Sequence, residues 1–275
     1  MFNAINKTAA ILLVGLAMAS CADKAKEGAM ELYKQSENAI EQREYKAALV
    51  YLDTLNNRYP QQTEIRRGGL RLRAMAMQGI ATDSIAVADA ALAQATALVE
   101  ELRPKFKHIE GAASLEGYFI PSDTKSNVMA GNAVQGRVSE KGFFYLVVNI
   151  QGRSIGFTGI RFASGNQSVE SQPISHARVI KVEGSESAVF SPEELQDVGP
   201  WLAEHTGALT ATLIGTKSNV SIKLTAAQAA SLALCSKYAT ALQAQRLASI
   251  HREKYERMLA TARDQIANNE PLSQE

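Results

Sequence analysis

The residue types that most often carry out chemistry in proteins are present in this chain, but their spacing forms no catalytic or metal-binding motif. The four histidines are His108, His176, His205 and His251. None has a second ligand at the i, i+4 spacing that places two imidazoles on one helical face. Ser122 and Asp123 could join a histidine in a Ser-His-Asp triad, but nearness in sequence is no signature of that triad. We therefore expect no enzymatic activity, no metal and no cofactor; a hydrolase with an unrecognised site is the least favoured alternative.

Two further groups of residues suggest anion binding by composition alone. Gly152, Gly156 and Gly159 have the spacing of a loose phosphate loop. They lie inside an alternating strand pattern with no following helix, so we expect turn and bulge glycines instead. The arginines between Arg66 and Arg73 recur at helical spacing, which favours a solvated helix face over an anion site.

The chain has two cysteines, Cys21 and Cys235, which excludes a disulfide framework and a cysteine-based metal site. Cys235 belongs to a helical pattern and is expected to be a small buried hydrophobic residue. Cys21 follows Lys7, an apolar run from Thr8 to Ala19, and small residues, which is the order of a secretory signal. The run has about 12 residues where a spanning helix needs roughly 20, so we do not expect a transmembrane anchor.

The stretch Met18-Ala19-Ser20-Cys21 resembles the lipobox of bacterial lipoproteins. The resemblance implies that residues 1–20 are removed as a signal peptide and that Cys21 is acylated, with palmitate-type chains, as the first mature residue. Ala22 follows instead of Asp, which in that family implies the outer membrane; the periplasmic face and the cell surface both stay open. A cleaved signal in which Cys21 has no role is the alternative.

Charge excludes some partners of the mature chain. Removing residues 1–20 takes away one lysine and leaves 28 basic and 28 acidic side chains out of the 29 and 28 of the full chain. A chain this neutral has no electrostatic footprint for nucleic acid or for an anionic membrane face.

Three regimes follow the signal, and the first resembles a tetratricopeptide-like helical hairpin. Tyr45, Ala48 and Pro60 match the second helix of that repeat, and Ser36 supplies the small residue of the helix before it. The resemblance covers about 35 to 50 residues, fewer than a peptide-binding superhelix needs. We divide the chain into the signal (1–20), an N-terminal helical region (21–110), an inserted β-rich domain (111–224) and a C-terminal helix (225–275).

Two apolar seams with alternating three- and four-residue spacing indicate an antiparallel coiled-coil stalk. The first seam comprises Ile85, Ala88, Leu92, Ala95, Val99, Leu102, Phe106 and Ile109. The second comprises Leu234, Tyr238, Ala241, Gln245, Ala248, Arg252, Tyr255, Leu259, Ala262 and Ile266. We expect an N-cap at Thr82 or Asp83, a kink at Pro104, a capping box from Thr225 to Gln228, and a weaker or wetter seam at Gln245 and Arg252.

In the region between the seams, apolar and polar residues alternate as they do in β-strands, which predicts a small antiparallel sandwich or barrel. The expected strands are 133–140, 143–150, 154–163, 177–183, 208–215 and 220–224, with a short helix from Ser191 to about Glu204 that Gly199-Pro200 interrupts. Lys141-Gly142 is expected to be a hairpin turn.

The fold class predicted is therefore α+β: a helical hairpin and a stalk, with a β domain inserted at the tip of the stalk. Recognition residues are expected in two polar loops, because loops on a rigid sheet often carry binding residues. The candidates are Ser122, Asp123, Asn127, Asn166 and Gln167. The function expected is a membrane-anchored envelope scaffold that binds a protein partner; a surface lipoprotein that binds a carbohydrate or another ligand is the alternative.

Overall fold

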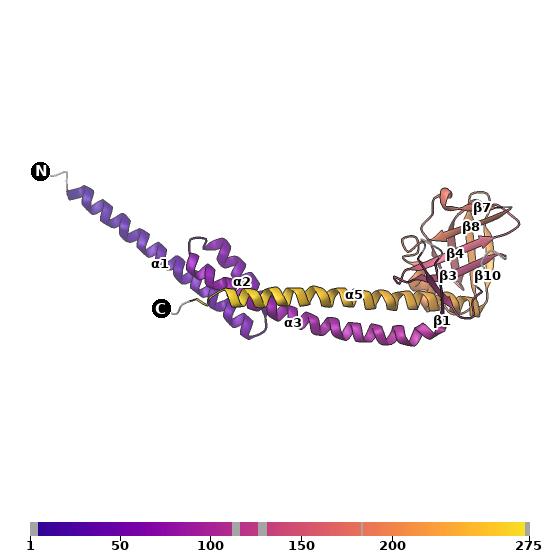
Figure 1. The fold of residues 1–275 in the computed structure, drawn as a ribbon. Helices are drawn as coiled ribbons and strands as arrows, with labels where there is room; N and C mark the ends of the chain where they lie inside the picture. The colour runs from indigo at the N-terminus through magenta and orange to yellow at the C-terminus, as the bar shows by residue number, and fades with distance from the viewer. Residues whose placement is uncertain (1–4, 112–115, 126–130, 183, 273–275) are drawn as a thin grey trace. The chain divides into compact units, whose positions relative to one another are not determined.

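The computed structural model describes residues 5–111, 116–125, 131–182 and 184–272, and for residues 5–22 it describes the backbone only. The described chain is α+β, with long helices at both ends of the sequence and strands between them (Figure 1). It divides into two compact units, Met1–Ala90 with Ser249–Glu275, and Ala91–Ala248. Within the described ranges, no helix is long and apolar enough to cross a membrane.

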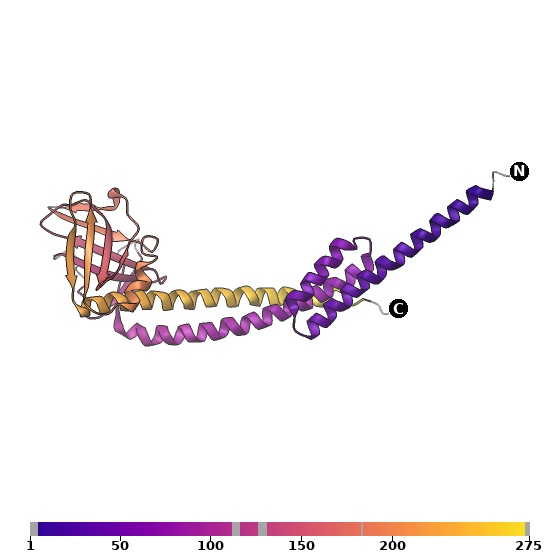
Figure 2. The same ribbon diagram turned by 180° about the vertical axis from the view of Figure 1, so that it is seen from behind.

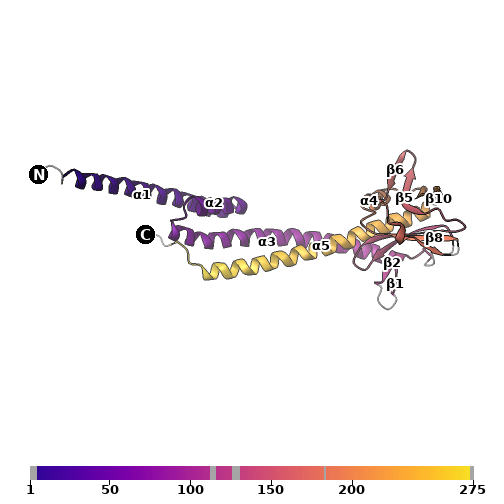
Figure 3. The same ribbon diagram turned by 90° about the horizontal axis from the view of Figure 1, so that it is seen from above.

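The first unit contains a helical hairpin formed by α1 (Ile5–Glu41) and α2 (Tyr45–Arg58), which lie side by side (Figure 3). Arg43 makes the turn with a positive φ of 63°. Ser36 and Ala48 are fully buried, and the Ser36 hydroxyl donates to the Ala48 carbonyl at 3.3 Å. These small side chains let the two helices approach closely, as the sequence predicts for this pair.

Helix α3 (Thr63–Leu102) is continuous, so the N-cap expected at Thr82 or Asp83 is wrong. Thr82 instead donates to the Gln78 carbonyl at 2.9 Å, as a threonine inside a helix does. Glycines that weaken a helix are retained here for close packing: a Cβ on Gly79 would lie 2.3 Å from the Tyr45 ring. Tertiary contact therefore overrides helix propensity along this stretch.

Helix α5 (Ala226–Asn268) runs antiparallel to α3 within the first unit. Arg252 pairs with Asp89 at 2.8 Å, and Arg71 donates to the backbone carbonyls of Ile266 and Asn269. The predicted seam positions Ala88 and Ala262 are buried in this unit. Arg252, expected to weaken the seam, thus has a carboxylate partner on the facing helix.

The same two helices meet in the second unit, where Gln245 donates to the Thr96 hydroxyl at 3.0 Å. Helix α3 ends at Leu102, so the expectation of a helix through Ile109 is wrong. Pro104 falls in a short 3-10 turn, η1 (Arg103–Lys105), because proline removes a backbone donor. The chain then enters a strand, and Phe106 stacks on Tyr238 of α5 with ring centroids 4.4 Å apart.

The strands of the second unit form two antiparallel sheets (Figures 1 and 2). The six-stranded sheet has the order β1-β2-β3-β4-β8-β7, and the four-stranded sheet has the order β10-β9-β5-β6. The strands of the first are β1 (Phe106–Ile109), β2 (Tyr118–Pro121), β3 (Ala133–Ser139), β4 (Phe144–Ile150), β7 (Ile180–Val182) and β8 (Ser185–Phe190). Those of the second are β5 (Phe157–Ser164), β6 (Gln167–Glu170), β9 (Leu209–Gly215) and β10 (Val220–Leu224). The described strands do not close into a barrel, so that alternative is wrong.

Both sheets share one hydrophobic core with the first part of α5. Gly142 turns the β3–β4 hairpin with a φ of +83°, as predicted. Residue 177 lies in a 3-10 turn, η2 (His176–Arg178), so β7 is shorter than predicted. Helix α4 (Val198–Glu204) begins later than predicted, and Gly199-Pro200 occupy its first turn, where proline loses no helical hydrogen bond.

Candidate functional site

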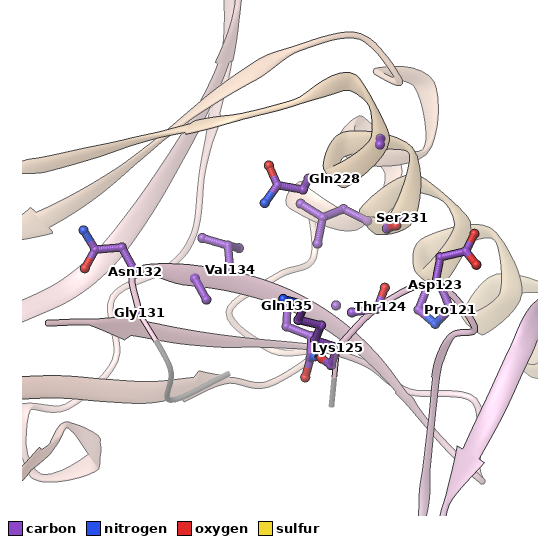
Figure 4. Close-up of a pocket in the computed structure, with 14 residues that line it drawn as sticks. Pro121, Asp123, Thr124, Lys125, Gly131, Asn132, Val134, Gln135, Gln228 and Ser231 are labelled. Carbon is purple, nitrogen blue, oxygen red and sulfur yellow. The ribbon is translucent and has the colours of Figure 1, made fainter. Parts of the chain in front are cut away.

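A polar pocket of ≈ 510 Å³ lies between β3 and the first turns of α5 in the second unit (Figure 4). Val134 and Gln135 of β3 line one side, and Gln228 and Ser231 of α5 line the other. The further lining residues are Pro121, Asp123, Thr124, Lys125, Gly131, Asn132, Ala133, Gly136, Ala227 and Leu232. Hydroxyl, amide and carboxylate groups in one concave site suit a hydrogen-bonding ligand.

Local sequence explains why α5 starts beside β3. Thr225 and Gln228 form the predicted capping box: the Gln228 side chain accepts from the Thr225 amide at 2.9 Å, and Thr225 accepts from the Gln228 amide at 3.3 Å. Gly136 then admits the helix, because a Cβ there would lie 3.1 Å from Cys235. Cys235 is fully buried, as predicted, and burial raises the pKa of its thiol.

Side chains of β1 and β3 hold the described part of the β2–β3 loop at this pocket. Gln135 donates to the Lys125 carbonyl at 2.7 Å, and Lys107 donates to the Thr124 carbonyl at the same distance. Because these donors sit on β1 and β3, which both pair with β2, they fix the backbone of Thr124 and Lys125 at the pocket.

A second pocket of ≈ 460 Å³ lies on the outer face of the six-stranded sheet. Cross-strand register brings its walls together: Arg137 of β3 stands opposite Tyr145 of β4, and Val147 of β4 stands opposite Val189 of β8. The other lining residues are Ile109, Glu110, Gly111, Glu116, Gly117, Tyr118 and Ser139. Tyrosine, valine and arginine side chains therefore share one concave patch, which we call the outer pocket.

Arg137 is the half-buried cation of the outer pocket. Its Nε donates to Gln135 at 2.8 Å, and its guanidinium carbon lies 4.2 Å from the centroid of the Tyr118 ring. Burial lowers the pKa of Arg137, and Tyr118 opposes that shift. Burial also raises the pKa of Tyr145, as do the charges of Glu116 and Glu193.

The predicted recognition residues are distributed over both sheets. Asp123 lines the polar pocket, whereas the Ser122 backbone donates to the Lys105 carbonyl of η1 and accepts from the Lys107 ammonium of β1. Asn127 lies outside the described residues. Asn166 is exposed in the β5–β6 turn, and Gln167 begins β6 and bonds to His205 at 2.6 Å. The polar pocket includes neither of these two, so the predicted residues do not form one site.

Two of the four histidines have ordinary side-chain partners in the described part of the chain. His108 bonds to Glu140 at 2.7 Å, and His205 stacks on Trp201 with ring centroids 3.8 Å apart. Among the described residues no group of histidine, cysteine and carboxylate side chains is arranged to hold a metal ion.

The glycines expected at turns and bulges also help to form an anion site, which their spacing in the sequence does not predict. Gly152 and Gly156 have positive φ angles of 75° and 66°, as turn glycines do, and the register shifts between Phe157 and Gly159. The Gly156 amide donates to both carboxylate oxygens of Glu186, at 3.0 and 2.9 Å. The loop thus binds an anion, and the anion is a side chain of the same protein.

Comparison of the chain with protein-family models, with curated protein sequences and with solved structures gives no match.

Proposed function

We propose that this protein is a non-enzymatic envelope lipoprotein, anchored in the outer membrane through acyl chains on Cys21, whose β-rich unit binds a partner protein. The lipobox-like segment supports the anchor. In this proposal α3 and α5 pair as a stalk that presents the β domain away from the membrane. The contacts Asp89–Arg252 and Thr96–Gln245 support that pairing, each within its own unit.

The observation that carries the binding role is the composition of the outer pocket. Tyrosine and arginine are, with tryptophan, the side chains most enriched at the energetic centres of protein interfaces. Val189 adds apolar surface that is 44% exposed, and Ile180 on the neighbouring edge strand is 60% exposed. Desolvating these groups against a partner supplies binding free energy that a fully polar sheet face cannot supply.

Site-specific photo-crosslinking tests the binding role. A benzophenone amino acid replaces Val189 in one variant and Ser221, an exposed residue on β10 of the other sheet, in the control. In intact cells we expect a discrete protein adduct from position 189 and none from position 221. The absence of an adduct at 189, or equal adducts at both positions, would contradict the proposal.

The polar pocket favours a second candidate function, the binding of a carbohydrate. Asp123, Gln228 and Ser231 offer a carboxylate, an amide and a hydroxyl to one ligand, which suits the hydroxyl groups of a sugar. On a glycan array we expect Asp123→Asn to weaken binding about tenfold, as loss of one charge-assisted hydrogen bond does. Asp197→Asn, an exposed aspartate outside the pocket, is the control; an array with no hits for the unaltered chain would exclude this candidate.

A further inference from the structure

The outer pocket holds hydrogen-bond donors that the described residues leave unused. A guanidinium carries five N–H donors in a planar fork. In Arg137 the Nε donor is bound to Gln135, while the two terminal nitrogens have no hydrogen-bond or ion-pair partner among the described residues. Two parallel N–H groups at the end of a fork match the two oxygens of a carboxylate.

The surroundings of Arg137 strengthen a contact between its guanidinium and a carboxylate. The side chain is half-buried over the Tyr118 ring, Tyr145 stands opposite it, and Val147 lines the same pocket. Water therefore screens its charge less than at an open surface. A desolvated cation gains most from a partner that is itself charged and forms bidentate hydrogen bonds. The geometry therefore favours a carboxylate over a neutral amide.

The rim of the pocket limits how much negative charge the partner brings. Glu110 and Glu116 also line it, and Glu116 accepts a hydrogen bond from the Lys141 amide at 3.1 Å and lies 3.6 Å from the Lys141 ammonium. These two carboxylates repel a dense acidic cluster. They are compatible with a single carboxylate that has apolar neighbours to cover Val147 and Val189.

The backbone argues for an acidic side chain as the source of that carboxylate. Chain-terminal carboxylates are commonly captured by groups of free backbone amides. Here the site is built from side chains in the middle of paired strands, with Arg137 in register with Tyr145 of β4. The ligand group must reach in from outside the sheet, as a glutamate side chain does.

We propose that the outer pocket binds a single acidic side chain of the partner, flanked by apolar residues, through a bidentate contact with Arg137 between Tyr118 and Tyr145. This inference rests on the proposed partner-binding function and names the chemistry of the partner.

The test uses blocked tripeptides as probes and the full chain without its signal. Acetyl-Leu-Glu-Leu-amide is titrated against acetyl-Leu-Gln-Leu-amide, while the backbone amide signals of Tyr145 and Val147 are followed by NMR. We expect the glutamate peptide to bind about tenfold more tightly or better. Acetyl-Leu-Gln-Leu with a free carboxyl terminus distinguishes the source and is expected to bind like the amidated glutamine peptide. Equal binding of the two amidated peptides, no binding by either, or preference for the free terminus would overturn the inference.

Variants provide a second, independent readout. Arg137→Gln is expected to remove the preference for glutamate, whereas Arg161→Gln, an exposed arginine of the other sheet that pairs with Glu170, is expected to keep it. The dispersion of the amide spectrum shows whether each variant folds. If Arg137→Gln does not fold, the comparison of the two amidated peptides on the unaltered chain still tests the preference for a carboxylate. Adducts at position 189 that persist unchanged in Arg137→Gln would overturn the carboxylate contact and leave partner binding intact. The absence of adducts at position 189 when Arg137 is unchanged would instead contradict the proposed function.

Discussion

Replacing Cys21, the proposed acylation site, by alanine is expected to abolish acylation of the chain and to move it from the membrane fraction to the soluble fraction. Each buried methylene of an acyl chain contributes about 0.8 kcal/mol to membrane binding, and stable anchoring needs more than one chain. The several acyl chains proposed for Cys21 would meet that requirement, whereas the residues after position 20, with 28 basic and 28 acidic side chains, offer no electrostatic substitute. We therefore expect an all-or-none effect on membrane association.

Metabolic labelling with a palmitate analogue, followed by fractionation of the cells, measures both effects. Cys235→Ala is the matched control, because Cys235 is the other cysteine of the chain and is fully buried beside Gly136. The control is expected to keep the label and the membrane location. Label that persists in Cys21→Ala, or an unlabelled parent chain, would show that Cys21 belongs to an ordinary cleaved signal or has no role.

The long helices could be predicted from the sequence because their periodicity is local. Seam positions such as Ala95, Leu102, Ala241 and Ala248 are buried as the three- and four-residue spacing requires. What the spacing cannot show is where a helix ends. Phe106 continues the apolar pattern, yet it belongs to β1, because Pro104 stops the helix and the Tyr238 ring offers a stacking partner from more than a hundred residues away.

The strands were predicted where they alternate clearly and missed where they are short or polar. Strand β10 matches its predicted range, Val220–Leu224, whereas β8 was not predicted at all. Its run Ser185–Phe190 includes a glutamate, which strand propensities disfavour. That glutamate is buried for a reason that only the folded loop opposite it supplies.

The outer pocket could not be found by motif. Its central residues Tyr118, Arg137, Tyr145 and Val189 come from four strands, and only the pairing register aligns them on one face. The sequence contains a weaker signal: Arg137 and Tyr145 lie four residues before and after Lys141 of the predicted Lys141-Gly142 turn, so a hairpin there would place them opposite each other. To recognise a site from that signal, one must know which face of the sheet packs against the hydrophobic core and which face stays open.

The buried carboxylate of Glu186 accepts the hydrogen bonds that hold the loop between β4 and β5. The side chain is fully buried and accepts hydrogen bonds from the Ser154 hydroxyl at 2.6 Å and from the amides of Ile155 and Gly156. Lys181 approaches it at 3.6 Å. Burial alone would raise the pKa of Glu186, but these hydrogen bonds and the Lys181 charge outweigh burial and hold its pKa below its usual value.

Glu186→Gln is therefore expected to lower the free energy of unfolding of the β-rich unit by about 2–4 kcal/mol. The amide is nearly the same size, but its NH₂ group replaces one of the two acceptor oxygens, so at least one of the donors that Glu186 satisfies loses its acceptor. The attraction between the carboxylate and Lys181 is lost as well. The carboxylate has a lowered pKa in the folded state, so its stabilisation is present above the unfolded pKa of about 4.3 and is lost as pH falls from there toward the folded pKa. The variant is expected to lack this part of the acid sensitivity.

Denaturant unfolding followed by the fluorescence of Trp201, the one tryptophan of the chain, measures both effects because that residue lies on α4 in the same unit. Glu170→Gln is the control: its carboxylate pairs with Arg161 at the surface, so the change is expected to stay within about 1 kcal/mol. If Glu186→Gln were as stable as the control at neutral pH, the loop would not depend on its internal anion. If Glu186→Gln also kept the acid sensitivity of the unaltered chain, another carboxylate would control acid unfolding. A large loss of unfolding free energy confined to Glu186→Gln would explain why a buried position of β8 is occupied by a glutamate and not by an apolar residue such as valine.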